Sequence, residues 1–77
     1  MKIEILFFGQ LTDKTGCSHM QLDNPGTIGQ LKEQLFHQFP ELKNAKFTIA
    51  INNRLIIEDQ IILENSTIAF MPPFSGG

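Results

Sequence analysis

Cysteine is nearly absent from this 77-residue chain, since Cys17 is its only representative. A single thiol excludes an internal disulfide framework and is typical of a reducing compartment, so we expect a cytoplasmic protein. Basic residues are scarce as well: six Lys and Arg are outnumbered by eight Asp and Glu, which gives a net charge of −2. Because no basic stripe is available to neutralise phosphates, nucleic acid is a poor candidate partner.

Long hydrophobic runs are also missing. The apolar stretches have the length of strands, and we expect no membrane span, signal peptide or lipid anchor. Neither glycine-rich phosphate loop, G-x-x-x-x-G-K or G-x-G-x-x-G, occurs, so we expect no nucleotide binding by this chain alone. A chain of this size forms one domain that buries only about 60% of the surface of its unfolded form. A deep internal active site is therefore not expected.

What the sequence does contain is alternation of apolar residues. In residues 2–8, Ile3, Ile5 and Phe7 share one face and Leu6 and Phe8 lie on the other, as in a strand that is buried more fully on one side. Similar patterns predict further strands at residues 18–23, 47–52, 54–57 and 67–71, a hairpin turn at 52–53 and an apolar patch at 61–63. Residues 10–16 are predicted to form a short helix or a loop.

One amphipathic helix interrupts these strands. Thr27 and Gln30 have the spacing of a capping box, which predicts a helix that begins at Thr27. Pro40 disfavours helical geometry at Phe39 and is expected to end the helix there. The apolar positions at helical spacing are Ile28, Leu31, Leu35 and Phe39. The resulting order β, β, α, β, β, β predicts an α+β domain, with a mixed sheet of about five strands packed on one main helix.

Side chains that could carry chemistry are few and scattered. His19 and His37 do not occur in a pattern with metal-ligand spacing, and Cys17 adds only one further ligand, so no metal site is expected. Cys17 and His19 lack a third group to orient them as a nucleophile and base. The neighbouring carboxylates Glu58 and Asp59 have no apolar pocket to separate their pKa values and suggest a loop. We expect no catalytic site within the chain itself.

Large apolar side chains gather instead near the two ends of the sequence. They are Phe7, Phe8, Phe70, Met71 and Phe74. Because neighbours in a strand point to opposite faces, some of them must lie outside the side that the helix covers. The sequence therefore predicts an exposed aromatic patch that serves as a partner interface, for which we select Phe7, Phe70, Met71 and Phe74.

The last six residues, 72–77, have a composition of their own. Pro72 and Pro73 favour a stiff, extended path, and Ser75, Gly76 and Gly77 follow. Since glycine has no Cβ, it can pass through a channel too narrow for other residues and leaves the final carboxylate sterically open. We therefore divide the chain into a domain at 1–71 and a flexible tail at 72–77 that is suited to insertion into a partner.

Three segments resemble the small subunit of molybdopterin synthase, in the MoaD family of ubiquitin-like sulfur carriers. They are residues 2–10 (KIEILFFGQ), 50–53 (AINN) and 68–77 (IAFMPPFSGG). The last is the specific one, because a Pro-Pro-x-Ser-Gly-Gly end is rare outside that family. The resemblance covers the whole chain and implies a β-grasp fold. Phe74 departs from the pattern, since the family more often has a smaller aliphatic residue there.

The resemblance also implies a mechanism. A ubiquitin-activating-type enzyme adenylates the Gly77 carboxylate with ATP, and a sulfur donor displaces AMP to leave a thiocarboxylate. The tail then enters the large catalytic subunit, in a heterotetramer, and sulfur passes to cyclic pyranopterin monophosphate for molybdenum cofactor biosynthesis. By this likeness Gly77 is the reactive residue, carried as glycyl adenylate or 1-thioglycine, while Gly76 and Ser75 thread the channel. The chain is then no enzyme on its own and binds no cofactor.

Other functions remain open at this point. One is sulfur transfer in another pathway, such as thiamin thiazole synthesis or tRNA thiolation, although the double proline argues against thiazole. Another is a ubiquitin-like modifier that is attached to lysines through Gly77. The third is a binding module with an inert tail. The partner that co-purifies and the chemical fate of Gly77 distinguish these possibilities.

Overall fold

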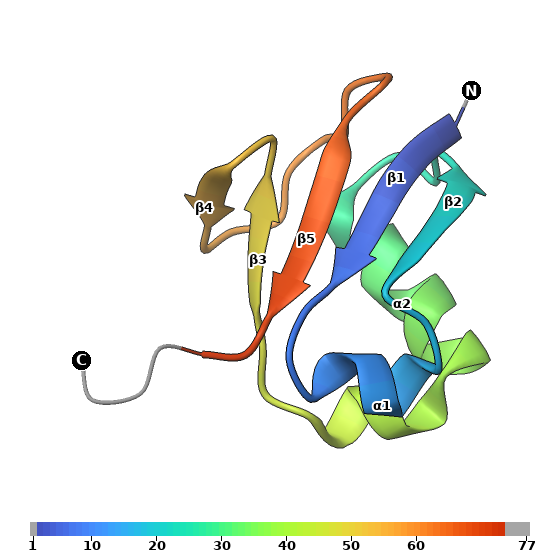
Figure 1. The fold of residues 1–77 in the computed structure, drawn as a ribbon. Coiled ribbons are helices and arrows are strands. Elements are labelled where there is room, and N and C mark those ends of the chain that lie inside the picture. Colours follow the sequence, from blue (N-terminus) through green and yellow to red (C-terminus); the bar gives the residue numbers. More distant parts are fainter. Residues whose placement is uncertain (1, 74–77) are drawn as a thin grey trace.

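The computed structural model describes residues 2–73, which form eight short elements (Figure 1). In chain order they are β1 (Lys2–Phe7), α1 (Leu11–Thr15), β2 (His19–Asp23), α2 (Ile28–Gln38), the 3₁₀ helix η1 (Pro40–Asn44), β3 (Thr48–Ile51), β4 (Arg54–Ile56) and β5 (Thr67–Met71). All five predicted strands and the main helix are present, and the segment at 10–16 contains the short helix α1. No helix within residues 2–73 combines the length and apolar content needed to cross a membrane.

The five strands form one mixed sheet in the order β2-β1-β5-β3-β4. The first and last strands of the chain, β1 and β5, lie side by side and run parallel, while the other neighbours are antiparallel. Helix α2 lies across one face of this sheet (Figure 1), and no helix of residues 2–73 covers the opposite face. We call this opposite side the outer face. Strand β5 is the middle strand, so the chain leaves the sheet after Met71 at the centre of one end of the sheet, away from both edge strands.

Helix α2 begins as the sequence predicts. The Thr27 hydroxyl accepts a hydrogen bond from the Gln30 N–H at 3.2 Å, and the Gln30 side chain accepts one from the Thr27 N–H at 3.1 Å, which completes the capping box. The α-helix ends at Gln38, but the chain continues directly into η1 with Pro40 in its first turn. This 3₁₀ turn was not predicted, because proline ends an α-helix but is well tolerated at a helix start.

The core lies between α2 and the inner side of the sheet. Alternation along β1 places Ile3, Ile5 and Phe7 inward, with exposures of 2% or less. From the helix come Ile28, Leu31 and Leu35, and from the remaining chain Leu11, Leu42, Ile49, Ile62, Ile68 and Phe70. The predicted helical face is thus the buried face. A two-layer arrangement of this kind hides the apolar side of each element against the other.

The segment between β4 and β5 is tied to the start of α2. The Ile28 N–H donates to the Gln60 carbonyl at 2.9 Å, and the Ile62 N–H donates to the Gly26 carbonyl at 2.8 Å. The Asp59 carboxylate accepts from the Gly29 N–H at 2.7 Å. A Cβ on Gly29 would lie 2.8 Å from the other Asp59 carboxylate oxygen, so glycine at this position makes room for the Asp59 cap.

Candidate functional site

Where β5 ends, the chain leaves the sheet close to the end of β1. The Phe8 N–H donates to the Phe70 carbonyl at 3.0 Å, one residue before β5 ends at Met71. Pro72 then packs over Gly9, which has a φ of +59°. A Cβ built on Gly9 would lie 2.7 Å from the Pro72 Cγ. Glycine at position 9 therefore serves both a left-handed backbone and the close seating of Pro72. We call Pro72 and Pro73 the tail root.

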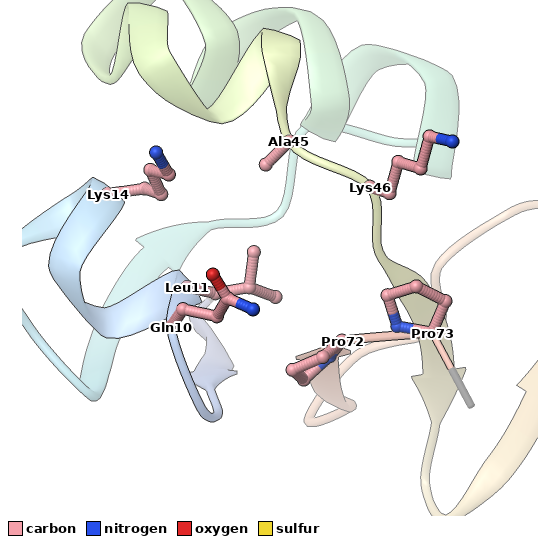
Figure 2. A pocket seen from close by; sticks show the side chains of 7 residues that line it. All are labelled: Gln10, Leu11, Lys14, Ala45, Lys46, Pro72 and Pro73. Atoms are coloured by element: carbon pink, nitrogen blue, oxygen red, sulfur yellow. The ribbon is translucent and has the colours of Figure 1, made fainter. Parts of the chain in front are cut away.

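A shallow hollow lies beside the tail root (Figure 2). Gln10, Leu11 and Lys14 come from the α1 region, Ala45 and Lys46 from the chain after η1, and Pro72 and Pro73 close the hollow opposite them. Both ionisable side chains that line it are lysines, and Lys14 also lies 4.0 Å from the Glu41 carboxylate. The surroundings of the tail root are therefore apolar at their base and positively charged at their rim.

The structure corrects the placement of two predicted interface residues. Phe7 is 2% exposed and Phe70 is fully buried. The parallel register of β1 and β5 sets them opposite each other, with ring centroids 5.5 Å apart, and both contact further phenylalanines of the core. Their side chains point to the helix side of the sheet and are not available to a partner. Phe7 and Phe70 are therefore core residues.

Met71 behaves differently, because it lies on the outer face and is only partly buried. The remaining predicted site residues, Phe74, Ser75, Gly76 and Gly77, lie outside the described residues.

The outer face carries an apolar patch that extends to the tail root. We call this the outer-face patch; its apolar members are Leu6, Phe8, Ala50, Leu55, Ala69 and Met71, which line one shallow hollow. Phe8 is 46% exposed and Leu55 is 53% exposed. The sequence contained a signal for Phe8 over Phe7: Lys2 and Glu4 share the face of Phe8, and charged residues mark the solvent side of a strand.

A polar pair borders the outer-face patch. His19 of β2 is opposite Leu6 of β1, and its ring contacts the Glu4 carboxylate, which also accepts a hydrogen bond from the Gln21 amide at 3.3 Å. The hydrogen bond from His19, and secondarily the one from Gln21, lowers the pKa of Glu4 below its ordinary value. Within residues 2–73, no group of three or more His, Cys, Asp or Glu side chains gathers in a way that could hold a metal ion.

A mixed sheet wrapped on one main helix, with a glycine-supported root where the last strand ends, defines a β-grasp, ubiquitin-like domain. Its fold matches the crystal structure of small archaeal modifier protein 1 from Haloferax volcanii with a TM-score of 0.78, 19% identity and coverage of 100% of both chains. It also matches a chain from the protein–protein complex of subunits 1 and 2 of the molybdopterin-converting factor from Helicobacter pylori, with a TM-score of 0.73, 22% identity and coverage of 100% of both chains. The predicted β-grasp fold is confirmed.

Sequence comparison gives the family. Residues 5–77 match the model of the ThiS family, and this chain belongs to that family. It is 30% identical over 80 residues to the molybdopterin synthase sulfur carrier subunit of Haemophilus influenzae, covering 97% of this chain and 99% of the relative. The corresponding subunit of Mycobacterium tuberculosis is 24% identical over 82 residues, with 100% and 99% covered. The resemblance found in the sequence is thereby confirmed.

The close seating of Pro72 on Gly9 leads to a first prediction. We expect Gly9→Ala to lower the free energy of unfolding by about 1–2 kcal/mol for the left-handed backbone, and by more because the new methyl group displaces Pro72. Gly16→Ala is the matched control: Gly16 has a φ of +78° and no atom within 4 Å of its built Cβ. Urea unfolding of both variants, with the amide NMR signals of Phe8 and Met71, measures the difference. Equal costs and unmoved signals would contradict the contact.

Proposed function

We propose that this chain is the sulfur carrier subunit of molybdopterin synthase. The single observation that carries the proposal is the match over nearly the full length of both chains to relatives of that name, one of them 30% identical. The end of the sequence supports it, since residues 72–77 read Pro-Pro-Phe-Ser-Gly-Gly. The β-grasp domain then acts as a handle, and the chemistry takes place at the Gly77 carboxylate.

In this proposal the carboxylate is first activated. An α-carboxyl group has a pKa of about 3.5, so it is ionised at neutral pH and is a poor electrophile. A ubiquitin-activating-type enzyme joins it to the AMP part of ATP and releases pyrophosphate, which gives the glycyl adenylate. Sulfur that the donor releases as hydrosulfide then forms a bond to the carbonyl carbon as the bond to AMP breaks, and the product is the thiocarboxylate, 1-thioglycine at Gly77. The chain binds no cofactor of its own and remains a substrate-like subunit.

The thiocarboxylate next transfers sulfur inside the large catalytic subunit of the synthase. Cyclic pyranopterin monophosphate is the acceptor, and the acid and base groups belong to the large subunit. Gly76 and Ser75 thread the channel that leads there. A fold match that belongs to a complex of subunits 1 and 2 of the molybdopterin-converting factor supports a partner of this kind. We place the whole reaction in the cytoplasm.

The outer-face patch is the proposed docking surface for the large subunit. It adjoins the tail root through Met71, so a partner that covers it also receives the tail. Phe8 supplies an exposed aromatic side chain of the type enriched at protein interfaces, Leu55 adds exposed apolar surface, and the His19–Glu4 pair supplies part of a polar rim. Met71 and Phe74 remain predicted interface residues.

The hollow beside the tail root suits the activating enzyme. Lys14 and Lys46 place two positive charges near the start of the tail, and opposite charge on a partner accelerates association. We propose that acidic side chains of the adenylating enzyme approach this side. Activation and sulfur delivery would then use different surfaces next to the same tail.

Intact mass spectrometry tests the proposed function. The chain is incubated with a ubiquitin-activating-type enzyme, ATP and a sulfur source, and the expected product has one oxygen replaced by sulfur at Gly77. Addition of the large synthase subunit and cyclic pyranopterin monophosphate should then return the carboxylate form. If the thiocarboxylate forms but keeps its sulfur in this mixture, and loses it only when a thiazole synthase is present, the result would instead favour the thiamin pathway.

The alternative with independent support is a protein modifier, because the fold also matches small archaeal modifier protein 1. That function predicts isopeptide bonds between Gly77 and lysines of other proteins. Peptide mapping of conjugates after cellular expression distinguishes the two: many linked proteins indicate a modifier, whereas free thiocarboxylate and a stable complex with the large subunit indicate the sulfur carrier.

A further inference from the structure

Strand β4 forms one edge of the sheet, and its backbone polar groups alternate in direction. The Asn52 N–H donates to the Thr67 carbonyl at 2.8 Å, which shows that even-numbered residues of the β3 region bond toward β5. Odd-numbered residues of β3 therefore bond toward β4, where they are opposite Arg54 and Ile56. The N–H and C=O of Leu55 consequently point away from the sheet. In the part of the chain that the structure describes, no strand pairs with this edge.

The residue types along this edge are arranged symmetrically about Ile56, and the side chains on either side of Ile56 are exposed. Leu55 is 53% exposed and Ile57 is 98% exposed, one on each side of Ile56. A cation, Arg54, precedes them and an anion, Glu58, follows. These charges bound a groove along the edge that all five residues line. The sequence of properties from 54 to 58 is thus cationic, apolar, apolar, apolar and anionic.

We propose that a second copy of this chain docks on the β4 edge, antiparallel to the first, with a twofold axis at Ile56. In this register Leu55 of one copy is opposite Ile57 of the other, and the outward N–H and C=O of Leu55 pair with the C=O and N–H of Ile57. Arg54 of each copy is opposite Glu58 of the other, so the dimer contains two ion pairs. Ile57 joins the strand, and two five-stranded sheets become one continuous sheet.

Self-complementarity favours a second copy over an unrelated partner. A twofold contact uses the same patch on both chains, and this patch carries opposite charges at equal distances from its centre. Moving the axis by one residue, to Leu55, sets Arg54 opposite Ile56 and leaves Glu58 without a charged neighbour. Only the axis at Ile56 satisfies both charges and the outward backbone groups. Because β4 is three residues long, the contact is smaller than that of a stable dimer, and we expect reversible association.

Charge reversal tests the register. We expect sedimentation equilibrium of the isolated chain to show a monomer–dimer equilibrium up to about 1 mM, a range set by millimolar dissociation constants of small contacts. Arg54→Glu and Glu58→Arg should each weaken dimerisation at least about fivefold, since each places like charges opposite each other twice. An equimolar mixture of the two variants should regain it, because every carboxylate at positions 54 and 58 of the first variant then faces a guanidinium of the second.

Two matched variants control for net charge. Lys43→Glu and Glu64→Arg make the same charge changes at exposed positions away from β4, and we expect them to leave the dissociation constant unchanged. As the protein concentration rises, the largest changes in amide NMR chemical shift should occur at Leu55 and Ile57. A wild-type chain that stays monomeric, a mixture that associates no better than its components, or controls that act like Arg54→Glu would overturn the proposal. The measurement uses no sulfur and no large subunit, so its result is independent of the proposed function.

Discussion

Removal of Gly77 is expected to abolish sulfur transfer and to leave the melting temperature of the domain unchanged. In the proposed function the reaction takes place at the Gly77 carboxylate, which the deletion removes together with the last residue of the tail. The core of the described residues, by contrast, lies between Ile3 and Phe70, so the deletion removes no core contact. Intact mass spectrometry of the loading reaction and thermal unfolding by circular dichroism measure the two effects.

A matched variant separates the carboxylate from the residue. Extension of the chain by one alanine after Gly77 keeps the glycine but converts its carboxylate into a peptide bond, and loading of the glycine should again be lost. If the extended or the shortened chain still sustains synthase activity at the wild-type rate, the tail is inert and the chain acts as a binding module. If the deletion unfolds the domain, the tail is part of the fold.

The elements of the fold could be predicted wherever local sequence determines them. The capping residues of α2 and the alternation in β1 and β5 both specify local geometry, and both predictions are confirmed. Asn52 and Asn53 adopt the positive φ values, 49° and 71°, that their place in a hairpin suggested. Short-range steric and hydrogen-bonding rules are sufficient at these positions.

Features that depend on contacts between residues far apart in the chain could not be predicted from the sequence alone. The parallel pairing of β1 with β5 joins the two ends of the domain, and no local signal records it. The apolar patch at 61–63 proved to be a tied loop, in which Ile62 is buried while Ile61 and Leu63 are exposed. Its conformation depends on hydrogen bonds to the start of α2, about thirty residues earlier in the chain.

The candidate interface shows the same division. Alternation correctly placed neighbouring residues on opposite faces, but the choice of Phe7 and Phe70 for the partner was wrong, since α2 covers their face. The number of large apolar side chains does not reveal which face a helix covers. The charged residues Lys2 and Glu4 carry that information, because they accompany Phe8 and not Phe7.

Phe7→Ala should therefore affect folding more than partner binding, and Phe8→Ala should affect partner binding more than folding. Phe7 packs on Phe39 and Phe70, so we expect its truncation to cost about 3–5 kcal/mol of unfolding free energy. Phe8 is 46% exposed, and its truncation should cost about 1 kcal/mol. For binding to the large subunit the order reverses: Phe8→Ala should raise the dissociation constant about tenfold or more, as for an aromatic residue at an interface centre. Urea unfolding measures the stability of both variants, and calorimetric titration, performed under conditions in which both are folded, measures their binding to the large subunit.

Unchanged binding by Phe8→Ala would show that the docking surface does not include this part of the outer face. A stability loss confined to Phe8→Ala would show that the assignment of Phe7 to the core and of Phe8 to the surface is reversed.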